Sequence, residues 1–366
     1  MNLLKDIIPI LYILGLIQGV IFGVLLIYLN RKRNRSTLFL GLFILVYSIN
    51  YIKPISKYLN LTEKYPTIND LPFDFTWLLF PLFYIYIINI SILPKSKKIY
   101  LYLIPGLIML IIDFLTYSNV SSTLNTIRNS SVYNFIHHIG DHLYAIFIFL
   151  KTYQFINNHT TETKNQYSST YGKELKWAKT FMFIGVLFTL AIHFKPKGYN
   201  VYLNSLISLI NVGLLYWVCI YGFRQLTIKS LIQQNTFKPK NANNNKHGNK
   251  ISKADKELFE KIEQLIPLKK LYKNVDLSIV DIANLTNEHP KRISTIINTA
   301  SNKNFKSYIN HFRIEEAKKM LESYNSDDFS IEGISIEVGF KSKSSFYQAF
   351  KKETKTTPTD YKSNFQ

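Results

Sequence analysis

Long apolar runs separated by short polar segments dominate residues 1–223. Seven runs can be distinguished, at 7–29, 38–52, 73–93, 99–117, 132–156, 177–194 and 199–222. A helix needs about 20 residues to cross the ~30 Å hydrocarbon layer of a bilayer. The run at 38–52 is short and the run at 177–194 is marginal, whereas the others reach that length. The pattern therefore predicts a bundle of about seven transmembrane helices in a lipid bilayer.

The pattern changes after Phe223. Residues 234–250 are polar, rich in Asn and Lys, and have no apolar face to bury. Such a composition is typical of a flexible, basic linker, which we place at 224–254. A helical period returns near residue 255. We therefore expect an all-α chain with a membrane domain at 1–223 and a soluble helical domain at 255–366.

Charge is distributed as unevenly as hydrophobicity. The chain of 366 residues has a net charge of +20, but residues 1–223 hold only 27 charged side chains, against 41 in residues 224–366. The first density is too low for a soluble domain. Abundant Tyr and Phe exclude simple disorder, and the single cysteine, Cys219, excludes a disulfide scaffold. A single soluble enzyme domain is therefore not expected.

The basic residues between the apolar runs predict an orientation. Four of them, Arg31, Lys32, Arg33 and Arg35, follow the first run, while Lys5 alone precedes it. Lys and Arg accumulate in cytoplasmic loops. This places the N-terminus outside, and with an odd number of crossings the C-terminal domain lies in the cytoplasm.

Two similar units of short helices follow the linker, and a longer helix joins them. In the first unit, Ser278 is suited to cap a helix and Pro290 to open the next one. In the second unit, Gly339 supplies the corresponding turn. Two short helices around a tight turn form a helix-turn-helix. The first unit, the joining scaffold helix and the second unit are predicted at about 277–300, 305–322 and 330–353.

Two strings in this segment are distinctive. The scaffold helix contains FRIEEAKKML, and the second unit contains EVGFKSKSSFYQAFKKET followed by TPTDY. On these strings, residues of about 258–364 resemble the DNA-binding domain of AraC-type (AraC/XylS family) regulators. Lys355, Asn302 and the pair Thr286–Asn287 stand where the family commonly has glycine or a glycine-containing turn. Asn tolerates the left-handed conformation, so we expect changed turn details and an unchanged fold.

The whole chain is also similar to bacterial proteins in which seven membrane helices are fused to such a domain. Gln18 and the string FPLFYIYI carry this second resemblance. It implies a one-component transcription regulator in the bacterial cytoplasmic (inner) membrane that needs no cofactor. The implied partners are double-stranded DNA and RNA polymerase, and pairing as a homodimer stays open.

The second helix of each unit should bury one stripe and present the opposite face to DNA. Amide and basic side chains suit base edges in the major groove, and lysines suit phosphates. The outer-face pattern and the resemblance point to base contacts by Lys291, Arg292, Thr295, Lys343, Ser344 and Gln348. The predicted phosphate contacts are Lys303, Lys306, Ser342, Lys351 and Lys352.

The string HHIGDH in the fifth apolar run is the one cluster of side chains in the membrane half that could bind a metal ion or relay protons. The chain has no phosphate-binding loop, nucleophile elbow or zinc motif, and we expect no enzyme. Ionisable groups within a bilayer usually face a bundle interior or a wet cavity. One interpretation is that these residues sense an unidentified small ligand or ion, and another is that several of them only cap the helices at the headgroup layer. A third is a membrane enzyme or transporter that uses His137, His138, Asp141 and His142. The candidate sensing cluster comprises Asp113, His137, His138, Asp141, His142 and His193.

Overall fold

The computed structural model is helical throughout its described part. It describes residues 2–28, 35–65, 68, 75–117, 126, 130–193, 201–233, 252–323 and 330–364, and none of these forms a β-strand. The all-α fold expected from the sequence is confirmed. The chain divides into two compact units: one comprises residues 1–159 and 175–229, and the other comprises residues 160–174 and 230–366.

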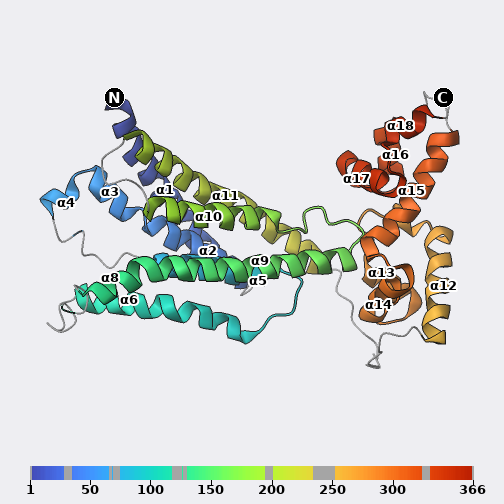
Figure 1. The fold of residues 1–366 in the computed structure, drawn as a ribbon, viewed down its shortest axis with the longest axis horizontal. Helices are drawn as coiled ribbons and strands as arrows, with labels where there is room; N and C mark the ends of the chain where they lie inside the picture. Colours follow the sequence, from blue (N-terminus) through green and yellow to red (C-terminus); the bar gives the residue numbers. More distant parts are fainter. Residues whose placement is uncertain are drawn as a thin grey trace. The chain divides into compact units, whose positions relative to one another are not determined.

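The N-terminal unit is a bundle of apolar helices (Figure 1), and each of the seven predicted runs coincides with helical structure. Its helices are α1 (Asn2–Tyr28), α2 (Arg35–Ile49), α3 (Ile52–Tyr58), α4 (Leu61–Lys64), α5 (Thr76–Ile90), η2 (Lys97–Leu103), α6 (Ile104–Tyr117), α8 (Ser131–Phe135), a π-helical turn η3 (Ile136–Gly140), α9 (Asp141–Gln166), α10 (Lys176–His193) and α11 (Val201–Gln233).

Four helical segments among the described residues are long and apolar enough to cross a bilayer. They are Ile7–Tyr28, Arg35–Tyr58, Lys97–Tyr117 and Tyr202–Gln225, and α5 is a shorter apolar helix. Helix α9 is less apolar overall because it starts with Asp141 and His142 and ends in the polar string NNHTTETKNQ. Seven crossings therefore stay a prediction.

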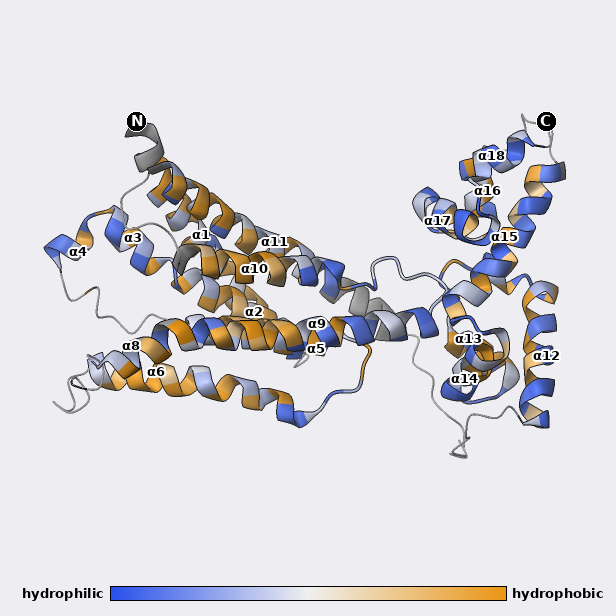
Figure 2. Ribbon diagram, viewed as in Figure 1, coloured by the Kyte–Doolittle hydropathy of each residue, from blue (hydrophilic) through white to orange (hydrophobic). Residues whose placement is uncertain are grey.

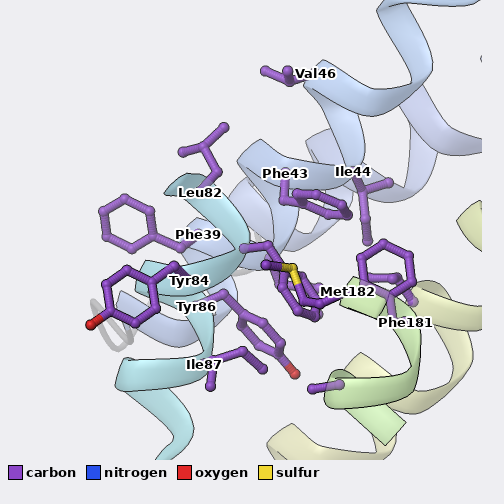
Figure 3. Packing of buried hydrophobic residues seen from close by; sticks show 14 of the residues in the cluster. Phe39, Phe43, Ile44, Val46, Leu82, Tyr84, Tyr86, Ile87, Phe181 and Met182 are labelled. Atoms are coloured by element: carbon purple, nitrogen blue, oxygen red, sulfur yellow. The ribbon is translucent and has the colours of Figure 1, made fainter. Parts of the chain in front are cut away.

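Aromatic rings fill the interior of this unit (Figure 3). The ring of Phe83 on α5 lies 5.3 Å from that of Phe43 on α2 and 4.7 Å from that of Phe181 on α10. The Tyr86 hydroxyl donates a 3.0 Å hydrogen bond to the carbonyl of Gly222 on α11. Many aliphatic side chains of α1, α6 and α11 are exposed. Figure 2 shows that these helices are largely hydrophobic along their length. An apolar exterior is what a lipid-facing bundle presents.

Three glycines on one face of α1 allow α2 to pack closely against it. Gly15, Gly19 and Gly23 recur every fourth residue, the small-residue spacing typical of tightly packed membrane helices. A Cβ added at Gly23 would lie 2.9 Å from the carbonyl oxygen of Gly41 on α2. At Gly19, a Cβ would overlap the buried Ser48 side chain. Only glycine permits this approach.

The C-terminal unit contains two small cores on one scaffold helix. Its helices are α12 (Lys253–Leu268), η4 (Leu271–Lys273), α13 (Ile279–Thr286), α14 (Pro290–Ser301), α15 (Phe305–Ser323), α16 (Ile331–Glu337), α17 (Lys343–Thr354) and α18 (Pro358–Ser363). The first half of α15 adds Phe305 and Ile309 to a core with α12, α13 and α14. Its second half adds Ile314 and Leu321 to a core with α16, α17 and α18. The first half of the scaffold helix thus holds the first helix-turn-helix, and its second half holds the second.

The turns explain the unusual residues noted in the sequence. Asn287, Asn302 and Lys355 adopt left-handed backbone conformations, with φ of 56°, 52° and 69°. Asn tolerates this conformation, whereas Lys355 does so at a cost of about 1–2 kcal/mol. Gly339 has a φ of 95°, and a Cβ there would lie 2.6 Å from the Tyr272 carbonyl oxygen. That position requires glycine.

The membrane-side end of the predicted linker is helical. Helix α11 continues to Gln233, ten residues beyond the predicted domain boundary at Phe223. In the string TIKSLIQ at its end, the apolar residues Ile228, Leu231 and Ile232 have the i, i+3, i+4 spacing of a helix. The polar stretch 234–250 lies outside the described residues, as do Arg31, Lys32 and Arg33 of the first loop.

Candidate nucleic-acid interface

Helix α14 of the first helix-turn-helix has one buried and one exposed face. Ile293, Ile296 and Ile297 are buried, and Lys291 and Thr295 are exposed, as the spacing predicted. The helix starts sharply because Pro290 occupies its first position and the His289 ring accepts a hydrogen bond from the Lys291 backbone N–H. A defined N-terminus places Lys291 at the end of the helix that enters a groove first, and Thr295 lies about one turn further along the same face.

Arg292 differs from the other predicted base contacts. Its Nε and Nη2 donate to the Asp255 carboxylate on α12 at 3.1 Å and 2.9 Å. Its Nη1 donates to the Glu288 carboxylate at 2.8 Å. The single positive charge of this guanidinium is shared between two carboxylates, and its bonds to Asp255 tie α12 to α14. Contact with a base would require these bonds to break, so the geometry favours a structural role.

Helix α17 of the second helix-turn-helix presents a more open polar face. Ser342 caps the helix by accepting a hydrogen bond from the Ser345 backbone N–H, and Phe346 and Phe350 are buried. The predicted base contacts Lys343, Ser344 and Gln348 are all exposed. They lie on consecutive turns, which is the arrangement required to follow base edges along a groove.

The predicted phosphate contacts fall into two groups. Lys351 and Lys352 are exposed in the last turn of α17. The ammonium of Lys303 lies 3.0 Å from the Glu353 carboxylate, which also accepts from the His311 ring at 2.7 Å. Lys306 Nζ donates to the Thr170 hydroxyl at 2.9 Å. The structure therefore gives Lys303 and Lys306 protein partners that the sequence did not reveal.

A buried arginine at the centre of α15 was missed by the sequence reasoning. Arg313 is only 1% exposed and donates to the carbonyls of Tyr272, at 2.7 Å, and Asn274, at 2.8 Å. It also donates to the Ser168 hydroxyl at 3.2 Å. Burial lowers the pKa of its guanidinium to about 10, so it stays charged at neutral pH. Its place in the string FRIEEAKKML could have singled it out, because it is the one cation on an otherwise apolar stripe.

The candidate sensing residues of the N-terminal unit form two separate groups. In the first, the Tyr133 hydroxyl donates to the Asp113 carboxylate, whose other oxygen lies 3.6 Å from His137 Nε2. In the second, Asp141 pairs with the adjacent His142, whose Nε2 lies 3.3 Å from the Thr189 carbonyl oxygen. The side chains of His138 and His193 lie outside the described part. Among the described residues, no three His, Cys, Asp or Glu side chains are grouped to hold a metal ion.

Comparison with protein families identifies the C-terminal fold. Residues 282–364 match a family model described as a helix-turn-helix domain. This range includes most of the first unit, all of α15 and the whole second unit. Residues 282–364 form a helix-turn-helix domain of the AraC type. The AraC-type domain binds DNA and regulates transcription. No curated protein and no solved structure matched the chain.

The two faces of α17 predict different effects on DNA binding. In a fragment from Ser252 to Gln366, Gln348→Ala should weaken binding to the preferred sequence by about 1–3 kcal/mol per base pair read, with little loss on random DNA. Lys352→Ala should weaken binding to both alike and make the salt dependence shallower by about one unit. Fluorescence anisotropy with both duplexes, across a salt series, measures this difference. Equal losses on both duplexes for Gln348→Ala would contradict base reading.

The Asp255–Arg292 pair predicts an acid-sensitive stability in the same fragment. Burial opposes ionisation of Asp255, but hydrogen bonds from Ser252 and Arg292 outweigh it and lower the pKa of this carboxylate. A lowered pKa stabilises the fold above the unfolded value of about 3.9, and this contribution is lost as pH falls through the lower folded value. Asp255→Asn should therefore cost about 1–2 kcal/mol at pH 7, with the difference from wild type shrinking in acid.

Chemical denaturation at several pH values measures this change in stability. Glu315→Gln is a matched control, because it removes a carboxylate from a partly exposed i,i+3 pair with Lys318. Ion pairs that solvent reaches contribute little to stability. A cost for Asp255→Asn that does not change with pH would show that its charge is not the stabilising feature.

Proposed function

We propose that the protein is a membrane-bound one-component transcription regulator. The observation that carries this proposal is that a DNA-binding domain of the AraC type shares one chain with four apolar helices long enough to cross a bilayer. An apolar exterior on the N-terminal unit supports insertion into lipid. A signal received in the membrane or at its outer surface then alters how the C-terminal unit binds DNA and acts on RNA polymerase.

We assign sequence reading mainly to α17 and the exposed residues of α14. Lys343, Ser344 and Gln348 would contact bases from one helix, and Lys291 and Thr295 from the other. Lys351 and Lys352 would bind phosphates, aided by Ser342 at the N-terminus of α17. The scaffold helix α15 has 19 residues and a length of about 28 Å. Two recognition helices at its ends suit successive major grooves, about 34 Å apart on one DNA face. One protomer would thus read about two turns, and a homodimer would read more.

The proposed topology predicts that the C-terminus lies in the cytoplasm of a bacterial cell and the N-terminus outside. DNA is reached only from the cytoplasm, so this location is required for regulation. Alkaline phosphatase, which is active outside the membrane, should be active when fused after Thr123 and inactive when fused after Gln366. A cytoplasmic reporter at the same positions should give the opposite result. Phosphatase activity at Gln366 would contradict regulation by the intact chain.

The group formed by Asp113, Tyr133 and His137 is the better-supported input site. It joins side chains from three segments, α6, α8 and the π-helical turn η3. In the second group, Asp141 and His142 are neighbours on the chain, and their contact with another helix is to the backbone carbonyl of Thr189. Single π-helical turns often occur at functional sites. A polar group shared by different helices can change its geometry when a ligand, an ion or a proton binds.

Replacement of Asp113 should therefore alter regulation. Asp113→Asn should change transcript levels of the genes that the protein occupies in cells, with membrane insertion and DNA binding in vitro unchanged. Crosslinking and sequencing identify those genes, and quantitative RNA measurement gives the change. Asp141→Asn is the comparison variant in the second group. Wild-type transcript levels in the Asp113 variant would exclude this group as the input.

A further inference from the structure

Residues 160–174, which comprise the last turns of α9 and most of its connection to α10, belong to the same compact unit as the DNA-binding domain. We name them the docking segment. Tyr167 forms an isolated antiparallel bridge with Ser278, and the Ser168 backbone N–H donates to the Leu277 carbonyl at 3.0 Å. Ser168 is 1% exposed and Thr170 is 4% exposed. Loops between helices ordinarily run over the surface, so this burial marks a specific contact.

The docking segment supplies a hydrogen-bond acceptor to the charged centre of the domain. The Ser168 hydroxyl accepts from Arg313 Nη2 at 3.2 Å, beside the carbonyls of Tyr272 and Asn274. A buried guanidinium needs several acceptors, because each unpaired donor costs free energy. The contact therefore reaches the scaffold helix that positions both helix-turn-helix units.

The same segment also engages two lysines of the DNA-binding unit. Lys306 Nζ donates to the Thr170 hydroxyl at 2.9 Å, and Lys341 Nζ lies 5.4 Å from the centre of the Tyr171 ring. Lys341 immediately precedes Ser342, the N-cap of the second recognition helix. Lys173 Nζ lies 3.3 Å from the Asp276 carboxylate, which also lies 4.0 Å from Lys341 Nζ. The segment thus provides oxygen and π-electron partners to cations that a DNA backbone would attract.

We propose that the docking segment is a built-in competitor of DNA for Lys306 and Lys341. DNA phosphates would bind the same two ammonium groups that the segment's hydroxyl and aromatic groups contact. Binding of DNA therefore weakens the contacts of the docking segment, and these contacts weaken binding of DNA. This rests on the proposed function, and it adds a route of control: the loop between two membrane helices restrains the domain, and its release raises DNA affinity. Because phosphate contacts carry no sequence information, the restraint acts on all DNA sequences alike.

The first test uses the full chain in lipid nanodiscs and a labelled random-sequence duplex of about 30 base pairs. Tyr171→Ala removes the aromatic partner of Lys341 and should tighten binding about two- to fivefold. Release of Lys341 should also make the salt dependence steeper, by up to about one unit. Tyr65→Ala is the matched control, since Lys64 Nζ lies 5.5 Å from that exposed ring in the N-terminal unit. Equal affinities and salt slopes for wild type and Tyr171→Ala would overturn the competition.

The second test fixes the docking segment in place. Tyr167 and Ser278 are partners in an antiparallel bridge. Opposed residues of this kind ordinarily have Cα atoms about 4.5–5.5 Å apart, which a disulfide can span. Both residues are therefore replaced by Cys in a Cys219→Ala background. Oxidation should form the bond in membranes, excess random DNA should slow its formation, and the oxidised protein should bind DNA more weakly than the reduced one. The Ser278→Cys single variant controls for loss of the helix cap.

The outcomes separate this proposal from the proposed function. Failure of the disulfide to form would overturn docking, and formation at the same rate with and without DNA would overturn competition. Absence of DNA binding by wild type and Tyr171→Ala alike, with the disulfide still forming, would instead overturn the regulator function on which the competition rests.

Discussion

The buried guanidinium of Arg313 is the interaction on which the C-terminal unit depends. It lies at the middle of α15, between the core around α13 and α14 and the core around α16 and α17. Its hydrogen bonds to Tyr272 and Asn274 fix the turn before α13, and the close approach of Gly339 to Tyr272 brings the second unit to the same turn. A charge in this place is stable only while each acceptor stays in position. Both helix-turn-helix units are therefore held to one geometry.

In the proposed membrane location, the N-terminal unit obeys a different constraint, which is the absence of water around its helices. Backbone groups in lipid must be satisfied internally, so helices are the natural solution and side chains decide how these pack. Here glycines on α1 let α2 approach, and rings on α2, α5 and α10 fill the interior. Hydrogen bonds between uncharged groups, such as that from Tyr47 to Asn211, also join its helices. The group of Asp113, Tyr133 and His137 differs from these because it brings a carboxylate of one helix to an imidazole of another segment.

The predicted DNA-contact residues show what the helical period of the sequence can predict and what it cannot. Spacing alone distinguished the buried Ile293 from the exposed Lys291, and the buried Phe346 from the exposed Gln348. It gave Arg292 the same outward direction as its neighbours. Spacing within one helix has no information about α12, whose Asp255 reaches Arg292 from 37 positions earlier in the sequence. Lys303, paired with Glu353, is a second instance of the same limit.

The sequence by itself determined the elements: where apolar helices lie, where the helix-turn-helix units begin and which faces they bury. These features follow from local periodicity, caps and turn residues, which act over a few positions. Only the tertiary structure decided which cations have partners and that residues 160–174 pack with a domain that starts some 80 positions later. Such contacts join side chains that are distant in sequence, and hydrogen bonds form wherever the packed helices bring donor and acceptor together. A local sequence pattern therefore does not predict which distant residues will be in contact.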